Sequence, residues 1–123
     1  MNSFSEGRKA SFRNALRGIY NVILSQVNFR IHLSILSIVI IAGLALRITL
    51  NDWVAIILAA GLVLTAECLN TAVEFLGDAC TKDFNPFVGK AKDAAAAGVL
   101  IASITAAVVG LIVFIPALLR FMN

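Results

Sequence analysis

The sequence contains few charged residues. Asp, Glu, Lys and Arg make up 14% of its 123 residues, whereas about a quarter is usual in a soluble domain. Hydrophobic residues make up 60%, and the mean hydropathy is +0.94. A soluble chain of this length could not bury so much apolar surface, so the composition predicts an integral membrane protein. The length allows one domain, expected to span residues 1–123.

Other features are scarce as well. Cys68 and Cys80 match neither a disulfide framework nor a metal-site spacing, so both are expected to be structural. Nucleic acid is not an expected partner, since no dense basic run with interleaved aromatic residues occurs. The first 30 residues lack the apolar stretch of a cleavable signal peptide. Neither a Gly-x-x-x-x-Gly-Lys-Ser/Thr loop nor the protein-kinase signature set is present, so the familiar nucleotide-binding folds find no support.

Long apolar runs are plentiful. About 20 apolar residues are needed to cross a bilayer as a helix, and three such spans are predicted, at about 31–50, 53–77 and 94–119. The fold class is therefore all-α, with three transmembrane helices.

Polar and breaker residues predict where these spans end. Asn51 and Asp52 are expected to form a tight turn that caps the second span. Pro86 and Gly89 are expected to keep the 78–93 loop from being helical, and Pro116 to mark the outer end of the third span.

An amphipathic helix is predicted before the first span, over about residues 8–29. Its apolar residues recur at the spacing of one helical face: Phe12, Leu16, Ile19, Ile23 and Val27. A basic amphipathic helix of this kind typically lies in the membrane interface, and packing against the helix bundle is compatible with that position.

The basic residues are distributed unevenly between the two sides of the membrane. Five precede the first span and three lie in the 78–93 loop, whereas Arg47 and Arg120 alone mark the other side. By the positive-inside rule, the N-terminus and this loop are expected to be cytoplasmic.

Two carboxylates, Glu67 and Glu74, lie within the second span. A carboxylate at bilayer depth costs roughly 3 kcal/mol even on lenient insertion scales. At about 100° per residue, these two residues share one face of the helix with Asn70, Thr71 and Asp78. We call these five residues the polar stripe, which is expected to run from lipid depth to the cytosol.

The polar stripe allows several interpretations. The acids can pair with basic residues for stability or be solvated at the interface, or they can line a proton or cation path through a small oligomer. They also suit phosphoryl transfer to a lipid, with one carboxylate as general base and another holding Mg²⁺, while loop lysines hold phosphates. His32, at the start of the first span, is expected to be an interfacial or hydrogen-bonded residue rather than a metal ligand.

Several motifs match one family. ECLNTAVE at 67–74 with Asp78, followed by AKD at 91–93 and an alanine-rich span, closely resembles the bacterial integral-membrane lipid kinases. These form the prokaryotic diacylglycerol kinase and undecaprenol kinase family. The resemblance extends to RG at 17–18, NFRIHL at 28–33 and DW at 52–53.

The resemblance implies a homotrimer in the bacterial cytoplasmic membrane that uses ATP and Mg²⁺ to phosphorylate a membrane lipid alcohol at sites shared between subunits. Glu67 matches the family's catalytic base, Asn70 the residue that orients the acceptor, and Glu74 a metal-binding and nucleotide-binding carboxylate. The remaining nucleotide contacts that it implies are Asn14, Arg17, Asp83, Phe84, Asn85, Lys92 and Asp93.

One position departs from the family pattern. Gln26 stands where the family usually has a second metal-binding Glu, so weaker Mg²⁺ binding is expected, and an impaired kinase is an alternative. A small ion-conducting or structural oligomer is the alternative from another class. Diacylglycerol and undecaprenol remain open as acceptors, although the 28–33 segment looks somewhat more like the undecaprenol-using branch.

Overall fold

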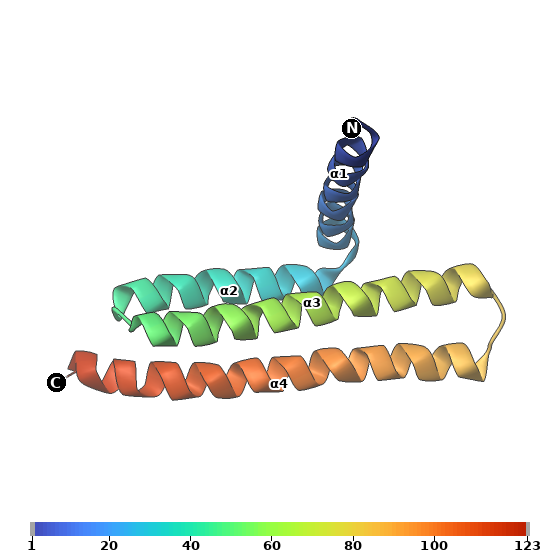
Figure 1. The fold of residues 1–123 in the computed structure, drawn as a ribbon. Helices are drawn as coiled ribbons and strands as arrows, with labels where there is room; N and C mark the ends of the chain where they lie inside the picture. Colours follow the sequence, from blue (N-terminus) through green and yellow to red (C-terminus); the bar gives the residue numbers. More distant parts are fainter. Residues whose placement is uncertain (1, 123) are drawn as a thin grey trace.

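A computed structural model describes residues 2–122, with side chains from Gly7 onward, and contains four helices. These are α1 (Asn2–Ser25), α2 (Val27–Ala45), α3 (Leu50–Cys80) and α4 (Pro86–Met122) (Figure 1). The last three are long and apolar enough to cross a membrane. The predicted all-α fold, with an N-terminal helix before three membrane spans, is confirmed, and the chain is a multi-pass membrane protein.

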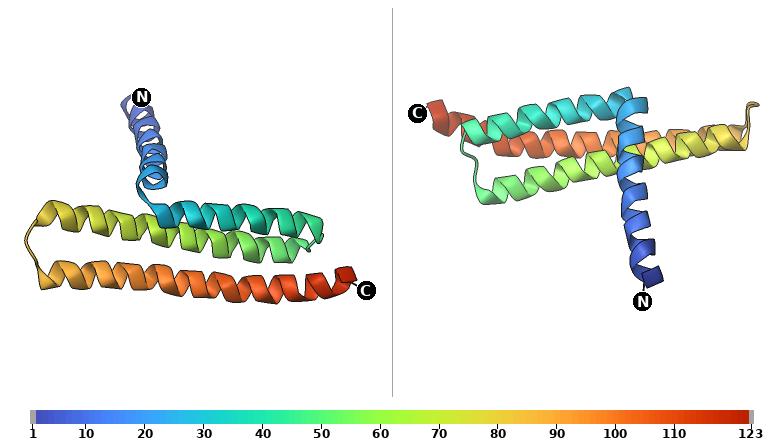
Figure 2. Two further views of the ribbon diagram at one scale, coloured as in Figure 1. Left: turned by 180° about the vertical axis from the view of Figure 1, so that it is seen from behind. Right: turned by 90° about the horizontal axis from the view of Figure 1, so that it is seen from above.

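The three long helices run side by side, and α1 runs across their direction in every view (Figure 2). The helix pair α3 and α4 extends past the start of α2, with the 81–85 loop at its tip. Phe12, Leu16 and Ile19 of α1 are exposed. The predicted apolar face is thus free to lie on lipid, as expected for an interfacial helix.

Gln26 separates α1 from α2. Its backbone is extended, with φ −107° and ψ 114°, and no side chain caps α2 at this point. The predicted surface helix over 8–29 was therefore too long at its C-terminal end, because residues 27–29 already belong to α2. The break lets α1 turn away from the bundle. Phe29, in the first turn of α2, is buried.

The turn between α2 and α3 differs from the prediction. At 1.5 Å per residue the 19 residues of α2 span about 28 Å, close to the roughly 30 Å of a hydrocarbon core. Thr49 caps α3: its hydroxyl accepts from the Asp52 N–H at 3.2 Å, and its own N–H donates to Asp52 Oδ2 at 2.9 Å. The predicted cap at Asn51 and Asp52 was misplaced, since both already lie within the helix.

The helix α4 is longer than the predicted third span. It begins at Pro86 rather than near residue 94, because proline is well suited to the first turn of a helix. Asn85 caps it, its Oδ1 accepting from the Phe87 N–H at 2.9 Å. Gly89 lies inside the helix, and the helix continues past Pro116 to Met122, so neither residue breaks it as predicted.

A cluster of buried hydrophobic side chains lies where α3 and α4 meet, at the end of the bundle opposite the 81–85 loop. Ile56 of α3 packs with Val113 and Ala117 of α4, and Trp53 lies against this cluster. Most other apolar side chains of α2, α3 and α4 are exposed. These exposed faces fit a protein whose surroundings are lipid or other membrane helices rather than water.

Candidate active site

Glu67 is the most deeply placed acid of the polar stripe. Glu67 is only 2% exposed. Its side-chain oxygen Oε1 lies 3.2 Å from Nε2 of His32 on α2. Thr71, one turn later on α3, is 1% exposed, and its hydroxyl donates a hydrogen bond to the backbone carbonyl of Glu67. A carboxylate taken out of water is stable only when it is paired or hydrogen-bonded, and His32 supplies that partner.

The pairing of His32 with Glu67 was not predicted. The sequence gives only a weak signal for it: both residues stand near the same predicted membrane surface, on neighbouring spans. Contact between their side chains depends on how α2 rotates against α3, which residue spacing does not determine.

Asn70 and Glu74 form the next layer of the site. The amide Nδ2 of Asn70 donates to Oε1 of Glu74 at 3.1 Å. The other amide atom, Oδ1, is buried and has no hydrogen-bond partner. Such an orphaned buried acceptor calls for an explanation, and here it leaves one oxygen available to a substrate donor beside Glu67.

Exposure increases along the polar stripe. Glu67, Asn70 and Thr71 are buried, Glu74 is partly buried and Asp78 is exposed. Exposure thus rises in the direction in which the stripe is expected to reach the cytosol. Lys92 of α4 donates to Oδ1 of Asp78 and so joins the outer end of the stripe to the second helix of the pair.

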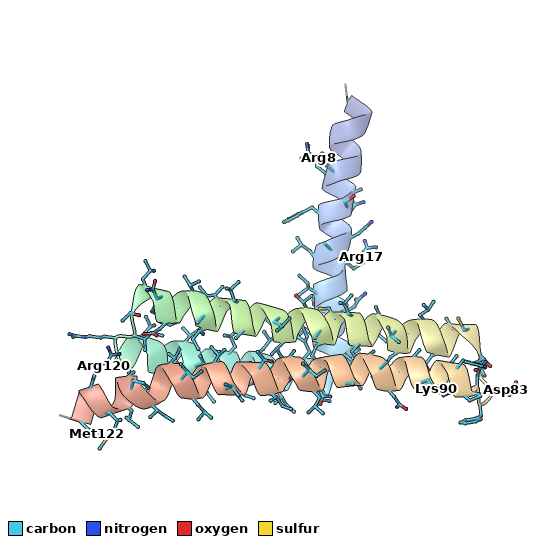
Figure 3. The ribbon with its side chains drawn as sticks, turned by 60° about the horizontal axis from the view of Figure 1, so that its bottom comes forward. Arg8, Arg17, Asp83, Lys90, Arg120 and Met122 are labelled. Carbon is cyan, nitrogen blue, oxygen red and sulfur yellow. The ribbon has the colours of Figure 1, made fainter. Side chains whose placement is uncertain are left out.

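The loop residues lie far from Glu67. Cys80 follows Glu67 by 13 residues, which is about 20 Å along α3. Asp83 lies at this end of the molecule (Figure 3), and the Phe84 side chain is 94% exposed. Asn85 uses its Oδ1 to cap α4, so only its amide NH₂ is left for a nucleotide.

The predicted residues on α1 are separate from the stripe. Asn14 and Arg17 are exposed, and Arg17 lies on the part of α1 that stands clear of the three long helices (Figure 3). Within residues 7–122 no hydrogen bond or ion pair joins either residue, or the Gln26 side chain, to the stripe. Asp93 is exposed on α4 beside Lys92. The chain thus holds an inner group around Glu67 and an outer group near the tip.

The described side chains gather few candidate ligands for a metal ion. Among the described side chains no three His, Cys, Asp or Glu residues come together in a metal-binding cluster. Mg²⁺, however, is commonly held by one or two carboxylates together with substrate phosphates. The carboxylate of Glu74, partly buried next to Asn70, fits that arrangement.

The fold and the site together define a multi-pass membrane protein with a buried carboxylate on its second membrane-spanning helix. Residues 13–114 match the family model described as "Prokaryotic diacylglycerol kinase". This match covers most of the chain, so the chain belongs to the prokaryotic diacylglycerol kinase family, as its motifs predicted.

Two relatives of known name are similar over most of this chain. The undecaprenol kinase of Bacillus subtilis (strain 168) is 34% identical over 108 residues, which is 88% of each protein. The diacylglycerol kinase of Synechocystis sp. is 36% identical over 113 residues, which is 91% of this chain and 65% of the relative. Both names describe lipid kinases, so the chain falls among phosphotransferases that act on a lipid alcohol.

Proposed function

We propose that this protein transfers the γ-phosphoryl group of ATP to the hydroxyl of a membrane lipid alcohol in a reaction that requires Mg²⁺. The observation that carries the proposal is the burial of Glu67, with His32 as its partner, on a helix that is long and apolar enough to cross a membrane. A lipid hydroxyl lies at the same depth, near the membrane surface.

Glu67 takes the proton of the lipid hydroxyl as the hydroxyl oxygen attacks the γ-phosphorus of ATP. The bond from that phosphorus to the oxygen of the β-phosphate breaks, and ADP leaves. A positioned general base typically contributes about 10²–10⁴-fold to the rate. His32 holds one carboxylate oxygen, which leaves the other for the substrate. Asn70 supports the same step, because its free Oδ1 can accept from the hydroxyl and orient it.

The nucleotide binds toward the aqueous end of the stripe. Lys92 neutralises phosphate charge, and Asp93, Asp83, Phe84 and Asn85 contact the remaining parts of the nucleotide. Asn14 and Arg17 of α1 close the site from the membrane surface. Since phosphoryl transfer depends mainly on positioning and electrostatic stabilisation, no further covalent chemistry is needed from the protein.

Glu74 is the residue that would hold Mg²⁺, with Gln26 contributing an amide oxygen. Held there, the ion would supply positive charge that offsets the negative charge developing on the phosphates during transfer. Glutamine brings an oxygen without charge, so we expect weaker Mg²⁺ binding than a second carboxylate would give.

Assembly as a homotrimer accounts for the separation of the two groups of residues. Asp78, the partner of Lys92, follows Glu67 by 11 residues, or about 16 Å along α3. A neighbouring subunit can bring its own outer group closer to Glu67, and the exposed apolar faces of α2–α4 offer the surface for such contacts. The N-terminus lies in the cytoplasm of the bacterium, where ATP is available.

The test is phosphate transfer from γ-labelled ATP in mixed micelles, with diacylglycerol and undecaprenol offered side by side and Mg²⁺ present or chelated. We expect a labelled lipid phosphate that disappears on chelation and in Glu67→Gln. A well-folded protein that labels neither lipid would contradict the proposal and favour an impaired kinase or a non-enzymatic membrane oligomer.

A further inference from the structure

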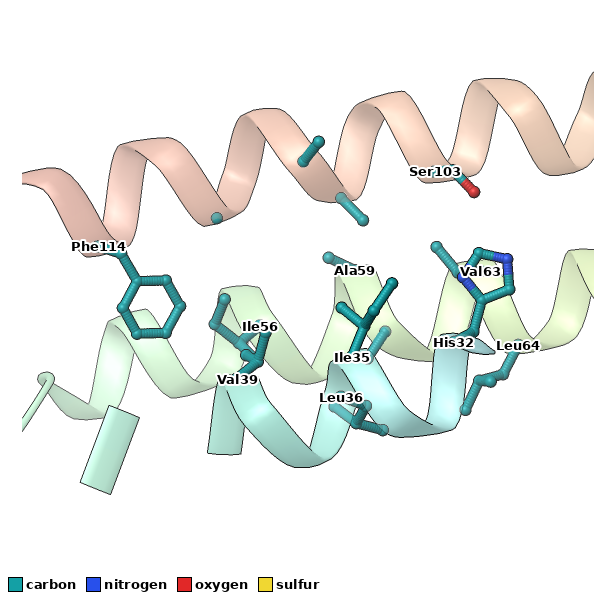
Figure 4. A pocket seen from close by; sticks show the side chains of 14 residues that line it. His32, Ile35, Leu36, Val39, Ile56, Ala59, Val63, Leu64, Ser103 and Phe114 are labelled. Atoms are coloured by element: carbon teal, nitrogen blue, oxygen red, sulfur yellow. The ribbon is translucent and has the colours of Figure 1, made fainter. Parts of the chain in front are cut away.

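Two polar side chains project into a cavity between α2, α3 and α4 whose other described lining residues are apolar. They are His32 on α2 and Ser103 on α4, and Figure 4 shows the imidazole ring and the hydroxyl pointing toward each other. His32 is also the residue that holds Oε1 of Glu67 through its Nε2. A hydroxyl of α4 thus faces the residue that positions the proposed base.

The contact with Glu67 determines which ring nitrogen of His32 carries a proton. An ionised carboxylate has only acceptor atoms, and the proposed base must be ionised before it takes the proton of the lipid hydroxyl. Nε2, which lies 3.2 Å from Oε1 of Glu67, therefore has to be the donor. In a neutral imidazole the other nitrogen, Nδ1, is then an acceptor. Nδ1 needs a donor from elsewhere in the fold.

The hydroxyl of Ser103 is free to be that donor. Thr105, two residues later on α4, donates its hydroxyl to the Ile101 carbonyl at 2.9 Å, which is a common bond for such a residue inside a helix. Within residues 7–122 no hydrogen bond engages the Ser103 hydroxyl or Nδ1 of His32. Ser103 is partly buried, and leaving a polar group unbonded away from water is unfavourable. Each of the two groups therefore lacks what the other supplies.

We infer that Ser103 is a positioning residue whose hydroxyl donates to Nδ1 of His32, directly or through one water in the cavity. This bond keeps the proton of the neutral ring on Nε2, so that His32 presents a donor to Glu67. The cavity of about 290 Å³ is far larger than one water needs. The inference rests on the proposed function, in which Glu67 is the base, and it extends the support of that base from α2 to α4.

Loss of the Ser103 hydroxyl would allow the ring to change its tautomer. With the proton on Nδ1, the lone pair of Nε2 would face Oε1 of Glu67, and two acceptors at 3.2 Å repel each other. The carboxylate would then lose the bond that orients it. Because the proposed nucleotide contacts lie at the outer end of the polar stripe, ATP binding should not depend on Ser103.

Nitrogen NMR of the histidine ring tests the inference directly, because His32 is the single histidine of the chain. In micelles, protein labelled with ¹⁵N in this ring gives one pair of signals, which report the nitrogen that carries the proton. We expect the Nε2–H form in the unaltered protein and a mixture of both tautomers in Ser103→Ala. Ser37→Ala is the matched control and should keep the Nε2–H form, because the Ser37 hydroxyl bonds to the Leu33 carbonyl and does not line the cavity.

Kinetics show whether the change in the ring reaches the base. With undecaprenol and diacylglycerol as acceptors in mixed micelles, Ser103→Ala should lower kcat roughly three- to tenfold, as expected for one neutral hydrogen bond. The KM for ATP should stay unchanged. Ser103→Thr keeps a hydroxyl and should retain most of the activity. In a His32→Leu background Ser103→Ala should cause no further loss, because Ser103 acts through His32.

Two results would overturn the inference while leaving the proposed function standing. One is a ring whose protonation in Ser103→Ala is the same as in the unaltered protein, and the other is an equal loss of kcat with and without His32. If Ser103→Ala does not assemble, Ser103→Val and Ser103→Thr give the same comparison at nearly equal volume. The ring signals can be read without turnover, so a protein that phosphorylates neither lipid would refute the proposed function and not the Ser103 bond.

Discussion

At the scale of single residues, the contact between His32 and Glu67 decides how the buried carboxylate is presented. A hydrogen bond to a charged group contributes about 1.5–3 kcal/mol, and this one holds Oε1, which leaves the other oxygen for the proposed substrate. The sequence predicted the depth of Glu67 and its neighbours on one helical face. It did not predict the partner, because that contact depends on packing between two helices.

Replacement of His32 separates positioning from simple burial. His32→Leu keeps an apolar side chain against α3 but removes the hydrogen bond, and we expect kcat to fall roughly tenfold to a hundredfold. His32→Gln can still donate to Glu67 and should recover much of that loss. Steady-state kinetics with saturating ATP measure the effect, and equal activity in the Leu and Gln variants would refute a role for the hydrogen bond.

The second prediction at this scale concerns Gln26. Gln26→Glu adds a carboxylate where the family usually has one, and tighter Mg²⁺ binding should allow turnover at lower Mg²⁺ concentrations. The measurement is a Mg²⁺ titration of lipid phosphorylation, with Gln26→Ala as the comparison. If the Glu variant shows no gain at low Mg²⁺, this position has no part in metal binding.

At the scale of helices, α3 and α4 extend past the start of α2. The outer group of site residues, which includes Asp78 and Lys92, therefore lies on this pair of helices and not beside α2. Hydropathy located all three spans, because a run of apolar residues is a strong signal. The predicted start of the third span, near residue 94, was too late, because Pro86 and Gly89 were interpreted as helix breakers. Proline at the first helical turn loses no intrahelical bond, and the Asn85 cap stabilises that turn.

Gly77 allows this pair of helices to come close beside Lys92. A Cβ on Gly77 would lie 2.8 Å from Cε of Lys92 and 2.9 Å from Cγ1 of Val88. We therefore expect Gly77→Val to push Lys92 away from Asp78 and to raise the KM for ATP several-fold with a smaller effect on the lipid KM. Gly61→Val is the control, because Gly61 lies on the same helix as Gly77 and a Cβ built on it meets no atom within 4 Å. Equal ATP constants in the two variants would contradict this interpretation.

At the scale of the whole molecule, the single chain separates the proposed base from most of the residues that are proposed to bind the nucleotide. The inner group lies around Glu67, whereas the 81–85 loop is about 20 Å farther along α3. Neither apolar pattern nor motif spacing can reveal how copies of the chain associate, so the homotrimer was expected from the family resemblance alone.

Mixed assemblies test whether subunits share a site. Glu67→Gln and Lys92→Ala should each be nearly inactive alone. If the base and the lysine of one site come from different subunits, mixing the two unfolded variants and refolding them together should restore part of the activity, with separately refolded samples as the control. Absence of any recovery in verified mixed oligomers would show that each chain supplies both residues to its own site.

The central claim is that Glu67 acts on the lipid hydroxyl and not on the nucleotide. The most direct measurement is ATP binding and lipid phosphorylation in the same preparation of Glu67→Gln, compared with Lys92→Ala. We expect Glu67→Gln to bind ATP as the unaltered protein does while its kcat falls by about 10²–10⁴-fold, and Lys92→Ala to lose ATP affinity. Substantial turnover by Glu67→Gln, or loss of its ATP binding, would contradict the assignment of Glu67 as the base.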